Sequence, residues 1–261
     1  MQTGLRFTIL GCGSSGGVPR LGNHWGECDP ENPRNSRLRC SMLVERIGPN
    51  GTTRALIDTT PDMRAQLLKA GIGVLDAVVF THAHADHTHG LDDLRQIVFN
   101  TRRRLPVWAD GPTQDSLYAR FAYAFDQPEG SAYPPICDMH AIRGAFQIEG
   151  AGGPIPFLPL KVAHGGIDAL RRTPHPTHAH LALALEWIER AAPARAVLTN
   201  MHIDLDHDRV AAETPAHVIP AHDGMVIELA EPRDLPRTTA SRQAPATRGP
   251  SKRPQKRKWT P

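Results

Sequence analysis

The alternation of apolar and polar residues along the chain predicts a series of strands and helices. Short runs rich in apolar and β-branched residues predict strands at 5–13, 40–47, 54–60, 75–80, 105–110, 157–165, 194–202 and 225–230. Amphipathic runs predict helices at 62–71, 90–100, 113–125 and 177–192. The last helix has Thr177 as its expected N-cap. Because strands and helices follow one another without internal repeats, the pattern favours an α/β or mixed architecture.

Two stretches break this pattern. Residues 11–39 form a long loop rich in Gly, Pro and Asn, and loops of this length within a domain are more often functional than passive. The stretch 231–261 holds nine Lys or Arg residues against two Asp or Glu, with six prolines and few apolar residues. Such a composition cannot bury enough apolar surface to offset the entropy of ordering. We therefore predict a folded domain at 1–230 and a disordered basic tail at 231–261.

Composition limits the class of protein. A chain of 261 residues with 40% hydrophobic content can bury one sizeable core. The chain does not open on a basic segment followed by a long apolar run, and no stretch of about 18 apolar residues occurs, so neither a secretion signal nor a membrane span is predicted. The four cysteines include no CxxC pair, which argues against a disulfide framework or a zinc ribbon. A cytoplasmic protein is expected.

The candidate chemistry lies in the segment THAHADHTH, which follows the predicted strand at 75–80. His82 and His84 stand two positions apart at the end of a strand, so their side chains point to the same side and can share one ion. Asp86 and His87 follow where the chain turns into a helix, and they can face a second ion. A mixture of imidazole and carboxylate ligands suits Zn²⁺, with Mn²⁺ or Fe²⁺ as alternatives. The spacing therefore predicts a metal site.

This segment resembles the HxHxDH signature of hydrolases with the metallo-β-lactamase fold. Other stretches, among them GCGSSGGVPRLGN, LIDTTPDMR, TPHPTHAHLALALEW and LTNMHIDLDHDR, are similar to a bacterial subgroup near the phosphoribosyl cyclic phosphodiesterases of the carbon–phosphorus lyase pathway. A more distant similarity is to the tRNA 3′-processing endonucleases. The likeness covers roughly residues 5–230. It implies a four-layer αβ/βα sandwich with two metal ions at the edge of its sheets.

The resemblance also implies a ligand set. Each ion would be held by two residues of the THAHADH segment and one later histidine: the first by His82, His84 and His164, the second by Asp86, His87 and His222. His164 lies in VAHGG and His222 in PAHDGM. Asp58 of LIDTT matches a carboxylate that braces such sites from behind the ligands.

One part of the family pattern is missing. Relatives carry two strands and an aspartate that bridges the two ions between the positions of His164 and His222, whereas here VAHGGIDAL runs almost directly into RRTPHPTHAHL. Asp168 is the candidate substitute for the bridge, although no strand returns it to the site. We therefore predict a sandwich that lacks two strands after His164, two zinc sites of which the second is weak, and slow hydrolysis.

Two catalytic roles are expected. Asp86 could accept a hydrogen bond from the attacking water while it binds an ion, and a histidine with a pKa near neutrality could protonate the leaving oxygen. His202 in LTNMHID is the candidate donor, because it follows a strand in the segment where phosphodiesterase relatives place theirs. His178, near the start of the helix at 177–192, could instead reach a substrate phosphate.

The sequence therefore predicts a metal-dependent phosphodiesterase that acts on a small cyclic or nucleotide-like phosphodiester. Two alternatives stay open. The first is a catalytically impaired member that binds metal or ligand without turnover, which the missing bridge favours. The second is an RNA-processing nuclease that uses the basic tail, although no segment resembles the protruding arm with which such nucleases clamp tRNA. Contact of the tail with nucleic acid and formation of a homodimer are also open, and no membrane partner is expected.

Overall fold

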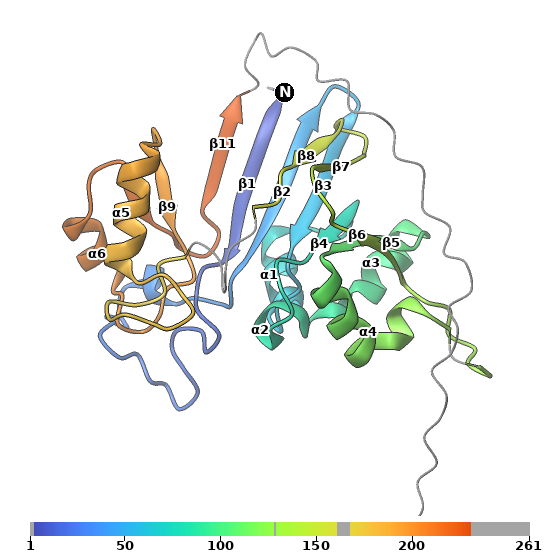
Figure 1. The fold of residues 1–261 in the computed structure, drawn as a ribbon, viewed down its shortest axis with the longest axis horizontal. Coiled ribbons are helices and arrows are strands. Elements are labelled where there is room, and N and C mark those ends of the chain that lie inside the picture. Colours follow the sequence, from blue (N-terminus) through green and yellow to red (C-terminus); the bar gives the residue numbers. More distant parts are fainter. Residues whose placement is uncertain (1–2, 128, 161–167, 231–261) are drawn as a thin grey trace, which may run out of the picture. The chain divides into compact units, whose positions relative to one another are not determined.

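A seven-stranded mixed sheet, with strand order β11-β1-β2-β3-β4-β5-β6, forms the centre of the fold (Figure 1). The computed structural model describes residues 3–127, 129–160 and 168–230. The strands of the sheet are β1 (Gly4–Gly11), β2 (Ser41–Gly48), β3 (Gly51–Ile57), β4 (Ala77–Val79), β5 (Leu105–Ala109), β6 (Cys137–Ala141) and β11 (Val226–Ala230). Strands β11, β1, β2 and β3 pair antiparallel, whereas β3 to β6 run parallel.

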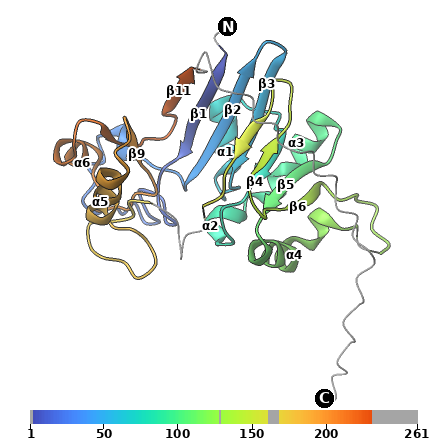
Figure 2. The same cartoon turned by 45° about the horizontal axis from the view of Figure 1, so that its top comes forward.

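Helices cover one face of this sheet. They are α1 (Met63–Ala70), α3 (Leu94–Thr101) and α4 (Gly111–Phe125), while the short α2 (Ala85–Thr88) and the 3-10 turns η1 (Pro33–Asn35) and η2 (Leu91–Asp93) lie in loops. Leu43, Leu56 and Val78 of the sheet pack against Leu67, Leu94 and Leu117 of the helices in one buried cluster. The hairpin of β7 (Phe146–Ile148) and β8 (Ile155–Phe157) lies over the opposite face (Figure 2) and buries Ile148 and Ile155.

A second region follows β8 in the chain. It consists of α5 (Leu181–Ala191), β9 (Ala196–Leu198), α6 (His207–Glu213) and β10 (Val218–Pro220), with β9 and β10 paired in parallel. Its core joins Leu181, Leu198 and Val210 to Ile9 and Cys12 at the end of β1. In Figure 1 these elements, in orange, lie beside the β11 edge of the sheet.

Several elements form where local chemistry predicts them. The GPNG turn joins β2 and β3 into a hairpin, with Gly48 paired to Gly51. Helix α1 ends at Gly71, which has the left-handed φ of 68° that helix termini favour. Because β3 and β4 are parallel, their carboxyl ends meet at one edge of the sheet, and this edge carries Asp58 and the histidine segment.

The start of α5 differs from the prediction. Helix α5 begins at Leu181 with His180 as its N-cap, so the assignment of Thr177 as N-cap is wrong. The reason lies in long-range hydrogen bonds: the backbone N of Ala179 donates to the carboxylate of Asp168, and the backbone N of Leu181 donates to the carbonyl of Arg171. These groups are held by the preceding loop instead of by a capping side chain.

Other boundaries also shift. The predicted helix at 90–100 is divided into η2 and α3. Of the predicted strand at 157–165, only Phe157 lies in a strand, as the last residue of β8, and residues 158–160 form no strand. Residues 161–167 and 231–261, and with them the predicted tail, lie outside the described residues. The sequence pattern did not reveal β6, the β7–β8 hairpin, β10 or α6.

The mixed α/β architecture is confirmed. The described residues between β8 and α5, which are 158–160 and 168–180, contain no strand, in agreement with a second sheet that is shorter than a full sandwich requires. None of the helices in the described ranges is long and apolar enough to cross a membrane.

Candidate metal centre

The histidine segment leaves the sheet at the carboxyl end of β4. The backbone N of Asp58 donates to the carbonyl of Val79, which ties the end of β3 to β4 just before the segment begins. Helix α2 then turns the chain within four residues, with His84 as its N-cap and His87 inside it. The turn brings the rings of His82 and His87 to a centroid distance of 4.1 Å.

The donor atoms of the segment form two pairs. Nε2 of His82 lies 3.0 Å from Nδ1 of His84, and Nε2 of His87 lies 3.4 Å from Oδ2 of Asp86. Two ligands bound at about 2.1 Å to one tetrahedral ion lie about 3.4 Å apart. Each pair therefore has nearly the spacing that a shared ion requires.

Asp58 braces this arrangement from behind. Its Oδ2 lies 2.8 Å from Nδ1 of His87 and accepts a hydrogen bond from the Thr81 hydroxyl at 2.7 Å, while its Oδ1 accepts from the backbone N of Thr81 at 2.8 Å. The carboxylate is buried, and its backbone has the left-handed φ of 61°. Since Asp58 engages Nδ1 of His87, the Nε2 atom faces Asp86, as in a ligand oriented by a carboxylate behind it.

Charge within the segment is unevenly distributed. Burial, together with the charges of His87 and His84, lowers the pKa of His82 to about 4. Burial alone would lower the pKa of His87 too, but its hydrogen bonds to Asp58 and Asp86 raise that pKa to about 10. Burial opposes a low pKa for Asp86, but the hydrogen bond and charge of His87 outweigh it and lower the pKa. Adjacent imidazoles thus cannot all hold protons, which suits a site where a cation replaces them.

Two further contacts hold the loop in place. Arg120 of α4 donates from Nη2 to the carbonyl of Ala83 at 2.6 Å, between the two histidines of the first pair. Gly90 closes the segment against Thr60, where a Cβ would lie only 2.0 Å from the Thr60 carbonyl oxygen. A side chain at Gly90 would therefore push the segment away from the end of the sheet.

The structure describes only part of the predicted ligand set. His164 lies outside the described residues. His222 follows β10, with its Nδ1 3.4 Å from the carbonyl of Asp223 and its ring 6.2 Å from that of His207. In the part of the chain that the structure describes, no three His, Cys, Asp or Glu side chains are arranged to hold one ion. The residues present fit a divalent ion as two donor pairs, and convergence of all six ligands stays a prediction.

Asp168 forms a second carboxylate–histidine contact. Its Oδ2 lies 2.7 Å from Nδ1 of His178 and also accepts from the side chain of Asn200, while its Oδ1 accepts from the backbone N of Ala179. The carboxylate is buried, and His178 remains partly exposed. Both oxygens of Asp168 thus orient His178 and its loop, which is a different role from bridging two ions.

His202 has a different environment. Its Nδ1 lies 3.0 Å from Oδ1 of Asp204, and its Nε2 is in contact with the guanidinium of Arg20. Because arginine is only a donor, Nε2 of His202 accepts in this contact. Burial and the charge of Arg20 lower the pKa of His202.

Cys40 links the regions that contain the two carboxylate–histidine contacts. Its Sγ atom lies 3.4 Å from the hydroxyl of Thr199. The next residue, Ser41, donates to the carbonyl of Asp58, and Asn200, which follows Thr199, donates to the carboxylate of Asp168. Burial raises the pKa of the Cys40 thiol to about 12, and the charges of Asp58 and Asp168 contribute.

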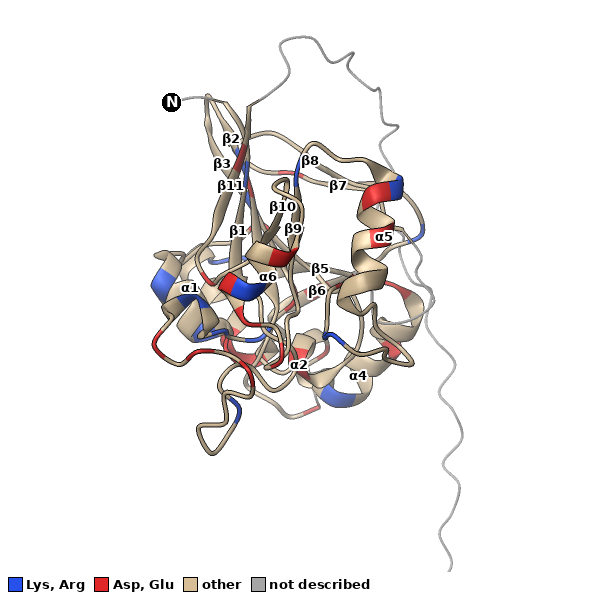
Figure 3. Cartoon of the chain, turned by 90° about the vertical axis from the view of Figure 1, so that its left-hand side faces the viewer, with Lys and Arg blue, Asp and Glu red and all other residues tan. Residues whose placement is uncertain are grey.

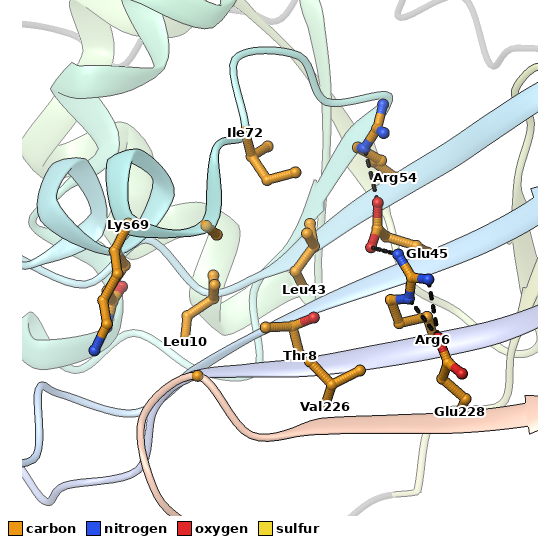
Figure 4. Close-up of a pocket in the computed structure, with 13 residues that line it drawn as sticks. Arg6, Thr8, Leu10, Leu43, Glu45, Arg54, Lys69, Ile72, Val226 and Glu228 are labelled. Carbon is orange, nitrogen blue, oxygen red and sulfur yellow. Dashed lines mark hydrogen bonds and ion pairs between the residues drawn. The ribbon is translucent and has the colours of Figure 1, made fainter.

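A separate cavity lies away from the histidine segment. It has a volume of about 650 Å³ and lies between α1 and the β11-β1-β2-β3 part of the sheet (Figure 4). Leu10 and Leu43 line it together with Lys69 and the ion pair of Arg54 and Glu45, whose Nε and Oε1 atoms are 2.9 Å apart. None of the candidate site residues lines this cavity, so its size does not mark it as the centre of the chemistry.

Comparison with known proteins provides independent information. Residues 53–176 match the model of the β-lactamase superfamily domain. A crystal structure of a diphosphatase from the PhnP family is similar at 32% identity and a TM-score of 0.73, over 86% of this chain and 98% of that one. Zn²⁺-bound PqqB from Methylobacterium extorquens shares the fold at 15% identity and a TM-score of 0.59, over 86% of this chain and all of that one.

One curated relative is a larger protein. An octanoyltransferase of Porphyromonas gingivalis (strain ATCC BAA-308 / W83) is 38% identical over 168 residues, which are 64% of this chain. The chain spans only 32% of the length of that relative. The match therefore concerns one part of the octanoyltransferase chain.

Proposed function

Because this chain belongs to the PhnP family of the metallo-β-lactamase superfamily of hydrolases, we propose that it is a divalent-metal-dependent phosphodiesterase acting on a small cyclic or nucleotide-like phosphodiester. The observation that carries the proposal is the pairing of His82 with His84 and of Asp86 with His87 in front of the buried carboxylate of Asp58. When bound, a divalent cation supplies Lewis acidity and makes water nucleophilic near neutral pH.

The residues of the chain have separate tasks in this proposal. His82 and His84 hold one cation, and Asp86 and His87 hold the other, with Zn²⁺ or Mn²⁺ as the ions. Asp86 also accepts a hydrogen bond from the attacking water through its remaining oxygen, which directs a lone pair of the water toward phosphorus.

We assign the proton donor to His178 in preference to His202. Asp168 holds Nδ1 of His178, which leaves Nε2 to donate to the departing oxygen. Nε2 of His202 faces Arg20 and acts as an acceptor, so it carries no proton in this arrangement. The sequence favoured His202 by its position after a strand, and the contact between Asp168 and His178 supports the new assignment.

The experiment compares two diesters that differ in their need for a proton. A 2′,3′-cyclic nucleotide releases an alkoxide, whereas bis(p-nitrophenyl) phosphate releases a stable phenolate. His178→Asn should slow hydrolysis of the cyclic nucleotide by about 10²- to 10⁴-fold and that of the nitrophenyl diester far less. His180→Asn, two residues further along, is the matched control and should keep the wild-type ratio. Equal losses on both diesters would show that His178 does not donate the proton.

A specific observation favours a second candidate, a member of the family that binds metal without turnover. The described residues between β8 and α5 contain no strand, and Asp168 is engaged by His178 and Asn200 instead of standing free to bridge two ions. Metal content measured with added Zn²⁺ and Mn²⁺, alongside hydrolysis of both diesters, separates the two candidates. Metal bound with no hydrolysis of either diester would favour the second.

A further inference from the structure

Thr81 stands between the end of β4 and the first histidine of the segment. The backbone N of Phe80 donates to the carbonyl of Trp108 on β5 at 2.8 Å, so the chain is still tied to the sheet one residue before Thr81. The backbone N of Thr81 then donates to Oδ1 of Asp58 at 2.8 Å. Thr81 is an exposed residue, but its backbone is held against the end of the sheet.

The hydroxyl of Thr81 contacts a carboxylate on one side and an imidazole on the other. Its Oγ1 lies 2.7 Å from Oδ2 of Asp58 and 2.9 Å from Nδ1 of His82. An ionised carboxylate only accepts hydrogen bonds, so the single hydroxyl proton is donated to Asp58. The hydroxyl oxygen then accepts, and the proton of the second contact belongs to Nδ1 of His82. Asp58 thus determines the direction of both hydrogen bonds in this relay from Asp58 through Thr81 to His82.

The direction of these hydrogen bonds determines the tautomer of His82. A neutral imidazole carries one proton, so a proton on Nδ1 leaves the lone pair on Nε2. Nε2 is the atom that lies 3.0 Å from Nδ1 of His84 in the first donor pair. Without a partner at Nδ1, the ring of His82 could carry its proton on Nε2 instead, where a cation could not bind.

Asp58 contacts the second donor pair directly. Its Oδ2 also accepts from Nδ1 of His87 at 2.8 Å, which leaves Nε2 of His87 on the side of Asp86. One buried carboxylate therefore orients a histidine of each pair. It reaches His87 by direct contact and His82 through the hydroxyl of Thr81.

Another support of the segment acts through the backbone. Helix α2 lies beside α4 at one end of the sheet (Figure 3), and Arg120 of α4 donates to the carbonyl of Ala83 at 2.6 Å. This contact fixes the path of the chain between His82 and His84. It does not determine which nitrogen of His82 carries the proton, because that depends on the partners of the ring.

We propose that Thr81 is a positioning residue that directs the lone pair of His82 Nε2 toward the first cation and so lets Asp58 support both metal sites. The proposal rests on the metal site of the proposed function and specifies how this chain holds it. Asp168, the candidate bridge, is engaged by His178 and Asn200, which leaves Asp58 as a carboxylate that both sites share.

The first test determines the tautomer of His82 without any metal. In the metal-free wild type, ¹⁵N NMR of labelled histidines above neutral pH should show His82 with its proton on Nδ1. Thr81→Val keeps the shape of the side chain and removes the hydroxyl, so the tautomer with the proton on Nε2 should appear. Thr81→Ser keeps a hydroxyl and should retain the wild-type signal.

The second test measures zinc affinity. Thr81→Val should weaken binding of the ion held by His82 and His84 by about 3- to 10-fold, since one hydrogen bond at an exposed residue is lost. The ion held by Asp86 and His87 should keep its wild-type affinity, and Thr81→Ser should behave as the wild type at both. Competition with a chromophoric chelator gives the affinities, and the ring ¹⁵N signals of His82 and His87 assign each binding step.

The outcomes separate this proposal from the proposed function. An unchanged tautomer of His82 in Thr81→Val, or an equal loss of zinc affinity at both pairs, would overturn the role of Thr81. A Thr81→Ser variant as impaired as Thr81→Val would also overturn it. No diester is used, so the expected tautomers and affinities in a protein that hydrolyses no diester would contradict the proposed function alone. Absence of zinc binding to the wild type would overturn both.

Discussion

In each of the two regions that supply the site, a buried carboxylate contacts Nδ1 of a histidine, but the secondary structure that holds the carboxylate differs between them. In the histidine segment, Asp58 lies 2.8 Å from Nδ1 of His87, and in the region after β8, Asp168 lies 2.7 Å from Nδ1 of His178. Asp58 follows β3 in the middle of a seven-stranded sheet. Asp168 lies in a loop of the region where the described residues form a sheet of two strands, β9 and β10.

Buried polar side chains hold the loops of the second region in place. Arg37 is almost fully buried and donates to the carbonyls of Leu205 and His202 and to the side chain of Asn35. Asn35 in turn donates to the carboxylate of Asp206 at 2.6 Å. The carbonyls of His202 and Leu205, which lie in the turn between β9 and α6, are satisfied by a guanidinium. The difference teaches that loops beside a short sheet can be held in place if buried side chains supply hydrogen bonds to their backbone.

The largest expected effect is a loss of stability when the buried guanidinium of Arg37 is removed. Arg37→Met keeps most of the volume but leaves the carbonyls of Leu205 and His202 without a donor, so the free energy of unfolding should fall by about 3 kcal/mol. Urea denaturation measures the change. Arg34→Met removes an exposed arginine of the same loop and should change stability little. Equal stability of the two variants would mean that the loop does not depend on the buried guanidinium.

The second largest expected effect is on zinc affinity in the histidine segment, where the bracing carboxylate of Asp58 follows a strand of the large sheet. Asp58→Asn keeps a residue type that tolerates the left-handed backbone but removes the charge behind His87, so zinc affinity should fall by about 10- to 100-fold. Competition with a chromophoric chelator measures the affinity. Asp168→Asn is the matched variant in the other region and should leave zinc affinity near the wild-type value. A similar loss in both would indicate that Asp168 acts on the ions after all.

A smaller effect concerns the ion pair between the end of the long loop and the start of α1. Arg39, the last residue of the loop 11–39, donates to Asp62 before α1 from its backbone N at 2.9 Å and from its side chain at 2.7 Å. Burial alone would raise the pKa of Asp62, but these hydrogen bonds and the charge of Arg39 lower it. A lowered pKa in the folded state adds stability above the unfolded value, and that stability is lost as pH falls through the folded value.

Asp62→Asn should therefore cost about 1 to 2 kcal/mol of unfolding free energy at neutral pH. The difference from the wild type should shrink below about pH 4, where the carboxyl of the unfolded chain is already protonated. Thermal or urea denaturation across pH 3 to 7 measures it. A cost that stays constant with pH would contradict an electrostatic origin.

The smallest expected effect comes from Arg120. It is exposed, so Arg120→Met should weaken zinc binding by only about two- to fivefold through loss of the contact to the Ala83 carbonyl. Arg95→Met, which removes a surface arginine near Asp92, serves as the control in the same chelator assay. No change in affinity would show that the end of the sheet alone positions the segment.

These contrasts also show what the sequence could reveal. The donor pairs were predictable because His82, His84, Asp86 and His87 lie within six positions, where strand and helix geometry determine which side chains meet. The mixed fold and most strands followed from short-range patterns for the same reason. The start of α5 was mispredicted because Asp168 and Arg171, ten or more residues away, engage the backbone that Thr177 was expected to cap.

Long-range polar contacts left no local signal. Arg20 and His202 are 182 positions apart, and Arg37 and Leu205 are 168 apart. An arginine in a polar loop has the same appearance in the sequence whether it is exposed or fully buried. In the sequence, Asp168 is distinguished only as an acidic residue after His164. Its contact with His178 depends on the path of the loop between them, which no hydrophobic periodicity predicts.

Cys40 has a consequence for how this site responds to oxidants. A thiol with a pKa of about 12 is almost entirely protonated in neutral solution, and only the thiolate reacts readily with peroxides or alkylating agents. Iodoacetamide and hydrogen peroxide should therefore leave the Cys40 thiol unmodified in the folded protein. Burial protects this thiol from chemical damage, with a smaller contribution from the charges of Asp58 and Asp168, the carboxylates that orient His87 and His178.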